Sequence, residues 1–140
     1  MEKKITKPKQ IIGRRELVDF PELGVIEIQA KIDTGAYSNT LHCSEINVRN
    51  KKLFFKVLNE KEHCFDIFSQ KKIKNSFGEA EKRYLIRTKI KIAGRVIKSI
   101  ISLTDRGNMR YPVLIGRRLL KNKFVVDVSL KINLCLKKFS

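Results

Sequence analysis

One tripeptide in this chain has the residue types that hydrolysis of a peptide bond requires: Asp33, Thr34 and Gly35. It follows an alternating strand pattern, and an apolar segment that ends in Gly-Arg comes later, at 113–117. Two carboxylates held about 3 Å apart cannot both ionise at neutral pH, so together they can act on water as base and acid. The chain has one Asp-Thr-Gly, so this chemistry would need two copies of it. The same tripeptide is also a common turn, which is the structural alternative.

Segments 32–36 and 113–117 together resemble the two signature segments of retropepsin-like aspartic proteases. The resemblance is closer to a bacterial branch of that family, formerly labelled ATP-dependent zinc proteases, and it covers nearly the whole chain. It implies a homodimer with one catalytic aspartate per subunit. Members of the branch are often associated with enzymes that add glutamates to a ribosomal-protein tail. The matching segments are 12–16 with 21–24, 30–36 with 41–42, 103–106, and 109–117.

The resemblance also implies roles for the residues of the site. Asp33 is the expected catalytic residue, and Thr34 is expected to bond across the dimer axis and hold the two loops rigid. Gly35 and Ala36 are expected to let backbone and substrate approach closely, because a larger side chain would intrude on the carboxylates. Gly116 is expected to do the same from beneath.

Two positions depart from the retroviral pattern. Tyr37 stands where the viral enzymes carry an acid that pairs with the arginine of the Gly-Arg motif. Arg117 therefore needs another partner, and the sequence leaves three candidates open: Glu16, Asp19 and Asp105. The glycine-rich flap of the viral enzymes is also missing, and the flap tip is predicted at Asn75, Ser76, Phe77 and Gly78.

The spacing of apolar residues predicts a mostly β chain. Residues 25–32 alternate, which places Ile26, Ile28, Ala30 and Ile32 on one face. A β-hairpin is predicted over 84–103 with its turn at Gly94, whereas 59–83 is weakly patterned and is expected to be a mobile excursion from the sheet. Beyond it we expect a strand at 113–115, a helical turn at 117–122, a strand at 124–128 and an alternating tail at 130–136 that pairs across the dimer.

Combined with the resemblance, this pattern predicts a retropepsin-like closed β-barrel, the acid protease fold, with one short helix and a homodimeric assembly. A chain of 140 residues with 42% hydrophobic residues fits one domain, predicted at 11–140 after a basic arm at 1–10. No run fits a signal peptide or a membrane span. Three cysteines form no disulfide framework, so reduced thiols and a cytoplasmic location are expected: Cys43, Cys64 and Cys135.

Lys and Arg outnumber Asp and Glu by 31 to 14, a net charge of +17. This balance favours polyanionic or acidic partners, and a glutamate-rich peptide tail is the preferred substrate class. A basic β-barrel that binds nucleic acid is a secondary hypothesis, because stacking aromatics are few. A retropepsin fold without catalysis, used as a binding module, is the third.

Two His-Cys dipeptides, His42-Cys43 and His63-Cys64, raise the question of a zinc site. Adjacent residues on a strand point to opposite faces, so such a pair can rarely give both side chains to one metal. Each cysteine is therefore expected to be a small buried residue, and each histidine to lie at the surface or to be hydrogen-bonded. No metal and no cofactor is predicted, and no phosphate-binding loop for ATP is present.

Overall fold

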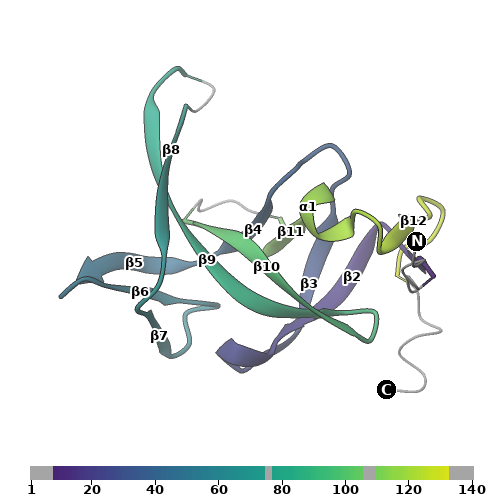
Figure 1. Cartoon of the computed structure of the whole chain (residues 1–140), viewed down its shortest axis with the longest axis horizontal. Helices are drawn as coiled ribbons and strands as arrows, with labels where there is room; N and C mark the ends of the chain where they lie inside the picture. Colours follow the sequence, from purple (N-terminus) through teal and green to yellow (C-terminus); the bar gives the residue numbers. More distant parts are fainter. Residues whose placement is uncertain (1–7, 75–76, 106–109, 133–140) are drawn as a thin grey trace, which may run out of the picture.

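A computed structural model describes residues 8–74, 77–105 and 110–132 of the chain. The described part is mostly β, with one short α-helix and one 3-10 turn (Figure 1). In chain order the elements are β1 (Gln10–Ile12), β2 (Arg15–Phe20), η1 (Pro21–Leu23), β3 (Val25–Ile32), β4 (Asn39–His42), β5 (Ser44–Arg49), β6 (Lys52–Lys56), β7 (Glu62–Phe65), β8 (Ser69–Lys74), β9 (Ala80–Ile92), β10 (Arg95–Thr104), β11 (Val113–Ile115), α1 (Arg117–Leu120) and β12 (Phe124–Val126).

Six strands close into a barrel. Their order is β10-β4-β11-β3-β2-β9, and β9 then pairs with β10 to complete the ring. Apolar side chains that alternate along these strands fill the interior, among them Phe20, Ile90 and Ile101, which are fully buried. Because each strand of a closed barrel has two hydrogen-bonded neighbours, closure removes the free edges that an open sheet would leave. The predicted fold class, a mostly β closed barrel with one short helix, is confirmed.

The β9–β10 hairpin is confirmed at its predicted turn. Ile92 pairs with Arg95, so the loop consists of Ala93 and Gly94, and both have positive φ, 51° and 78°. Two consecutive residues in this conformation give a tight turn whose twist matches that of the flanking strands.

The predicted face of β3 is right for three positions and wrong for Ile26. Ile28, Ala30 and Ile32 are buried, but Ile26 is 71% exposed. The cause is a local irregularity: Glu27 has φ 51°, and the register between β2 and β3 shifts beside it. One irregular residue reverses the inside–outside alternation of a strand, so the residue before it faces solvent.

The segment 59–83 is not an excursion without structure, as the sequence suggested. It holds β7, β8 and the start of β9. β8 pairs with β9 to form a hairpin that projects from the barrel, and β5, β6 and β7 form a separate three-stranded sheet beside it (Figure 1). Polar residues dominate these strands because much of their surface faces solvent, so the apolar alternation that marks a half-buried strand is weak.

The two ends of the described chain lie together. β1 pairs in parallel with β12, so Gln10, which was predicted to belong to the arm, starts the first strand. β12 ends at Val126, two residues before its predicted end. Residues 130–132 are not a strand, and the carbonyls of Leu130 and Lys131 accept hydrogen bonds from the backbone of 14–15 within the same chain. Residues 1–7 of the arm and 133–136 of the predicted tail lie outside the described residues.

Across the described ranges, no helix has both the length and the apolar composition needed to cross a membrane.

Candidate functional site

The turn after β3 holds the Asp33 side chain in a fixed place. The Asp33 N–H donates to the carbonyl of Ile115 on β11 (2.8 Å), and the Ala36 N–H donates back to the Asp33 carbonyl (3.2 Å). The Asp33 carboxylate is half-buried, and its Oδ1 accepts the N–H of Gly35 (3.0 Å). A backbone donor aimed at a carboxylate restricts its rotation. Oδ1 is therefore held by a hydrogen bond within the turn, while the carboxylate stays partly accessible to solvent.

Gly35 leaves little room beside this carboxylate. A Cβ at Gly35 would come within 3.3 Å of Asp33 Oδ1. That contact is tighter than ordinary van der Waals packing, so a larger residue here would press on the oxygen. Thr34 and Gly35 are themselves exposed at the surface of the turn.

Gly116 lies directly beneath the same turn. A Cβ at Gly116 would meet three backbone oxygens, of Ser38 (2.5 Å), Tyr37 (2.7 Å) and Ala36 (2.8 Å). The next two residues then bond the turn, because the backbone N–H groups of 117 and 118 donate to the carbonyls of Ala36 (2.8 Å) and Tyr37 (2.9 Å). The start of α1 is thus fastened to the Asp33 turn through backbone alone.

A buried amide that the sequence reasoning missed joins these parts. Asn39 is fully buried at the start of β4; its Oδ1 accepts the N–H of Gly116, and its Nδ2 donates to Ser99 Oγ and to the carbonyl of Ile100, all at 3.0 Å. A buried side chain with donor and acceptor both satisfied fixes its neighbours firmly. No strand was predicted at 39–42, so the one available signal, an amide at an inward-facing strand position, was not recognised.

Arg117 bonds a carbonyl and not one of the three candidate carboxylates. Its Nη1 donates to the carbonyl of Thr34 at 2.9 Å. Two of the candidates have bonds elsewhere: Glu16 accepts the N–H of Gly13, and Asp19 accepts the N–H of Glu27. A guanidinium can serve a carbonyl as well as a carboxylate, and sequence alone cannot show which acceptor the fold presents.

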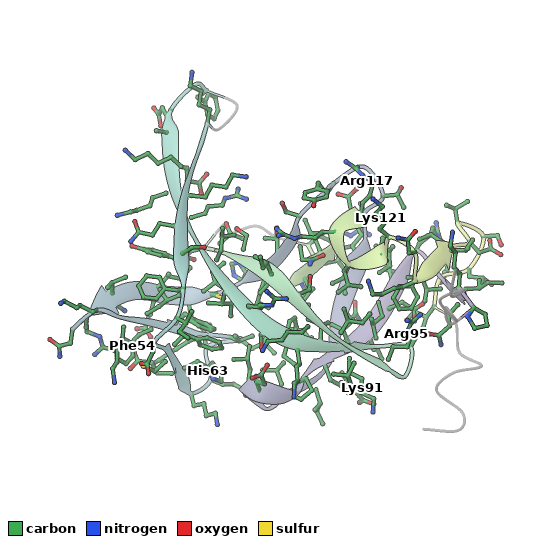
Figure 2. All side chains as sticks on the ribbon, viewed as in Figure 1. Phe54, His63, Lys91, Arg95, Arg117 and Lys121 are labelled. Atoms are coloured by element: carbon green, nitrogen blue, oxygen red, sulfur yellow. The ribbon has the colours of Figure 1, made fainter. Side chains whose placement is uncertain are left out.

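A hollow of about 610 Å³ borders the turn on the side of α1. Figure 2 labels two of its lining residues: Arg117, which begins α1, and Lys121, which directly follows it. Its lining combines apolar side chains with two cationic ones, which suits a bound side chain with an apolar stem. The lining residues are Thr34, Tyr37, Arg117, Leu120, Lys121, Asn122, Phe124 and Val126.

The predicted flap falls at the end of the β8–β9 hairpin. Phe77 is 86% exposed there, and Gly78 has φ 78°, a conformation that favours glycine. Asn75 and Ser76 lie outside the described residues. That the end of the β8–β9 hairpin covers Asp33 as a flap stays a prediction.

The two His-Cys pairs differ in how well they fit the expectation: Cys43 is buried as predicted, whereas both members of the pair on β7 depart from it. On β7, His63 is buried with its ring 5.5 Å from that of Phe55, whereas Cys64 is exposed, so both predictions for this pair were wrong although the side chains do face opposite ways. Burial lowers the pKa of His63 and raises the pKa of the buried Cys43 thiol. Among the residues that the structure describes, no group of three or more His, Cys, Asp or Glu side chains is placed to hold a metal.

Comparison with known proteins gives three kinds of match. Residues 11–133 match the family model described as RimB-like, retropepsin-like aspartic endopeptidase RimB. Two curated relatives, both named probable alpha-L-glutamate ligase, are 34% identical over 134 residues in Shewanella pealeana and 29% identical over 140 residues in Desulfotalea psychrophila. The matches cover 86% and 88% of this chain but only 29% of each relative, so the chain spans less than a third of their length.

A solved structure is also similar over almost its whole length. The crystal structure of Lpg0085 from Legionella pneumophila, a protein of unknown function (DUF785), superposes with a TM-score of 0.69 at 26% identity, covering 90% of this chain and 98% of that one.

Proposed function

The chain belongs to the RimB-like family of retropepsin-like aspartic endopeptidases, and from this premise we propose that it hydrolyses peptide bonds as a homodimer with one Asp33 from each subunit. The observation that carries the proposal is the anchoring of the Asp33 turn. Its carboxylate is held by the Gly35 N–H, its backbone by Ile115, and the turn rests on a glycine that leaves no space for a side chain. Such rigidity is what a pair of carboxylates needs to stay within hydrogen-bond reach of one water.

In the proposed reaction, the two Asp33 carboxyls face each other at the dimer axis and share one proton. The ionised one takes a proton from water as the water oxygen attacks the peptide carbonyl carbon. The other donates its proton to the carbonyl oxygen, which gives a neutral tetrahedral species. The C–N bond then breaks, the leaving amine nitrogen takes a proton from the dyad, and the other carboxyl regains one from the collapsing diol.

The neighbours of Asp33 have supporting roles in this proposal. Arg117 holds the Thr34 carbonyl, which orients the turn from the α1 side. Thr34 would bond across the dimer axis, and Gly35 with Ala36 would let the substrate approach. The β8–β9 hairpin would cover the peptide in the groove between subunits, with the tip at 75–78 as the flap.

We propose an acidic, glutamate-rich peptide tail as the substrate class. A net charge of +17 would attract such a tail over long range and raise its association rate. The curated relatives are named probable alpha-L-glutamate ligase, and a segment similar to this chain makes up 29% of each of them, which supports a substrate that contains glutamate. A ribosome-associated protein end of that kind is the proposed partner, in the cytoplasm.

The test is mass-spectrometric detection of cleavage in a peptide pool that includes glutamate-rich and matched glutamine-rich peptides, from pH 4 to 8. Wild type and Asp33→Asn are compared, after sedimentation has shown that both are dimers. We expect cleavage by wild type alone and a preference for the acidic peptides, because the amide cannot accept the proton of water. Equal cleavage by both proteins would remove Asp33 from the mechanism.

Absence of cleavage by either protein would favour one of the other two functions. A dimer that binds peptides without turnover would be a retropepsin-fold binding module. Salt-sensitive binding of oligonucleotides without any effect on peptides would favour the nucleic-acid hypothesis, which rests on the same positive charge.

A further inference from the structure

A second hollow, of about 430 Å³, has a strongly cationic lining. Among the residues that the structure describes, six line it: five are Lys or Arg, the sixth is a tyrosine, and none of the six carries a carboxylate. The lining residues are Arg14, Arg15, Lys31, Arg110, Tyr111 and Lys131. We refer to it as the cationic pocket.

Four separate parts of the chain build the cationic pocket: residues 14–15, 31, 110–111 and 131. Arg15 and Lys31 are directly opposite each other on the antiparallel strands β2 and β3. Lys131 is brought close by Gly13, where a Cβ would come within 2.8 to 3.0 Å of the 130–131 backbone. Tyr111 precedes β11, which pairs with β3. The barrel's own strand order, and not one basic run in the sequence, therefore collects these charges.

The electrostatics of the pocket are unfavourable when it is empty. Like charges directly opposite on neighbouring strands destabilise a sheet. Arg15 Nη1 makes a long contact of 3.5 Å with the Tyr111 hydroxyl, and the Arg110 guanidinium lies 5.8 Å from the centre of the Tyr111 ring. The hydrogen bond from Arg15, and then the positive charges of Arg15, Arg110 and Lys31, lower the pKa of Tyr111. An anionic occupant would relieve this repulsion.

We propose that the cationic pocket binds the side-chain carboxylates of an acidic peptide and anchors that peptide beside Asp33. This role of the pocket rests on the proposed peptidase function, because the anchored peptide would be the substrate. Guanidinium groups suit the task because their planar N–H fork matches the two oxygens of a carboxylate. Three arginines and two lysines could together engage more than one carboxylate.

The place of the pocket favours a peptide that reaches the Asp33 turn. Lys31 is separated from Asp33 by Ile32 alone, and the Ile32 N–H donates to the carbonyl of Arg14 (2.9 Å). At about 3.3 Å per residue along a strand, the backbone of Lys31 lies about two residues' length from that of Asp33. A bound acidic segment could therefore continue toward Asp33 with few intervening residues.

A nucleic-acid strand fits the pocket less well. Binding of single strands combines cations with aromatic faces on which successive bases stack. Within the described part of the chain, the pocket has one aromatic lining residue, Tyr111, and the Arg110 guanidinium already lies beside its ring. Those described residues offer no row of faces on which several bases could stack.

The experiment measures binding apart from cleavage. Full-length Asp33→Asn is titrated against a fluorescein-labelled peptide of eight glutamates by fluorescence anisotropy at fixed salt, with an eight-glutamine peptide as the neutral control. Arg15→Gln/Arg110→Gln is then added, and Lys89→Gln/Lys91→Gln is the matched control, because both pairs remove two charges and Lys89 and Lys91 are exposed on β9, outside the pocket. We expect Kd to rise about tenfold or more for the pocket pair and less than about twofold for the control pair.

A folding control and a competition experiment accompany the titration. Circular dichroism and thermal melting show whether each variant folds; if Arg15→Gln/Arg110→Gln does not, Lys31→Gln/Arg110→Gln replaces it, because both of those side chains are exposed. Equal Kd values for the pocket and control pairs would overturn the proposal. So would an oligonucleotide or inorganic phosphate that displaces the peptide at lower concentration than free oligoglutamate does, since the pocket would then select phosphates.

The two proposals can fail separately. Tight glutamate-peptide binding that the pocket pair abolishes, without any cleavage by wild type, would support the pocket and refute the peptidase. Cleavage of acidic peptides with an unchanged KM in the pocket pair would support the peptidase and refute the pocket.

Discussion

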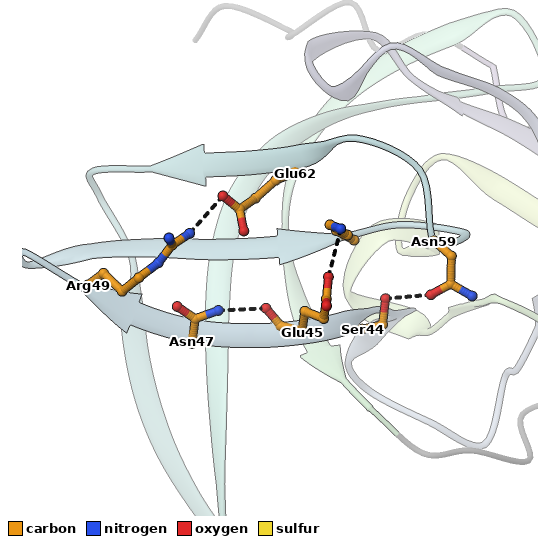
Figure 3. A network of polar contacts seen from close by, with 7 residues as sticks. Ser44, Glu45, Asn47, Arg49, Asn59 and Glu62 are labelled. Atoms are coloured by element: carbon orange, nitrogen blue, oxygen red, sulfur yellow. Dashed lines mark hydrogen bonds and ion pairs between the residues drawn. The ribbon is translucent and has the colours of Figure 1, made fainter.

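Side-chain hydrogen bonds stabilise both the Asp33 turn and the β5–β6–β7 sheet. The two regions differ in whether those hydrogen bonds are buried or lie at the surface. At the Asp33 turn, the amide of Asn39 is fully buried and bonds three groups from β10 and from Gly116. In the three-stranded sheet the ties lie at the surface: Arg49 with Glu62 (2.7 Å), Asn47 with the carbonyl of Glu45 (2.8 Å), and Ser44 with Asn59 (2.8 Å) (Figure 3).

The length of a hydrogen bond therefore says little about how much that bond stabilises the fold. A surface pair exchanges its bond with water when it opens, so its loss is nearly neutral. A buried group that loses its partner keeps no bond at all and bears the full cost of desolvation. The candidate site is thus held by contacts that tolerate little change, and the sheet by contacts that tolerate much.

The largest effect is expected from Gly116→Ala. The backbone there is extended, φ −101° and ψ −177°, so any residue could adopt it, but a Cβ would meet three carbonyl oxygens within 2.8 Å. We expect the free energy of unfolding to fall by about 3 kcal/mol, because the turn must move away from α1. Urea denaturation measures it.

Gly94→Ala is the matched control for that variant. Gly94 has φ 78° and nothing within 4 Å of a built Cβ, so the cost there is conformational and about 1 kcal/mol. If the two alanine variants were equally stable, close packing beneath the Asp33 turn would not be what holds it.

The next largest loss of stability is expected at the buried Asn39, and the half-buried Asn47 serves as its comparison. Asn39→Ala leaves the Gly116 N–H and the Ile100 carbonyl without this partner inside the barrel, so we expect a loss of about 2 kcal/mol in the free energy of unfolding. Asn47→Ala removes one exposed bond of similar length and should cost less than about 0.5 kcal/mol. Similar losses for the two variants in chemical denaturation would contradict the idea that the buried hydrogen bonds contribute more to stability than the exposed one.

A pH effect tests the one buried titratable group of the three-stranded sheet. Burial lowers the pKa of His63 below its ordinary 6.5, so the unfolded chain binds its proton at higher pH than the folded chain does. The contribution of His63 to stability is therefore complete above pH 6.5 and declines as the pH falls below it. In His63→Phe, which can still pack on Phe55, the midpoint of urea unfolding should fall less between pH 7.5 and 5.5 than in wild type.

His42→Gln, at the chain's other histidine, is the control for this series. A wild-type fall in stability that His63→Phe retains in full would assign the pH dependence to other groups.

The smallest effect is expected at the Arg49–Glu62 ion pair. Its side chains are 53% and 39% exposed, so a double-mutant cycle with Arg49→Ala and Glu62→Ala should give a coupling of about 0.2–1 kcal/mol. The coupling should shrink in 1 M salt, where the Debye length is about 3 Å. Arg49 also lies 3.9 Å from the centre of the Phe54 ring, which the cycle cancels. A coupling above about 2 kcal/mol that does not fall in 1 M salt would show that this surface ion pair stabilises the fold as strongly as a buried one.

Local pattern was sufficient for the elements that depend on neighbouring residues. Alternation along 25–32, the turn at Gly94, the strand at 113–115 and the helix that follows it were all predicted, because period and turn chemistry are properties of a short segment. Local pattern failed at Ile26, where a positive φ at Glu27 reverses the alternation, and over 59–83, where strands mostly covered on one side only give a weak apolar signal.

Residue types and their order were enough to identify the candidate reactive groups: an aspartate in a glycine turn, an apolar strand ending in Gly-Arg, and an excess of positive charge. Which of these groups lie in contact became known only from the fold. Asn39 bonds Gly116 across 77 positions, Arg117 bonds the Thr34 carbonyl across 83, and strands β2 and β3 with the approach to β11 gather the cationic pocket. The physical reason is that a residue's type fixes what bonds it can make, whereas strand order and register fix which partner is within reach.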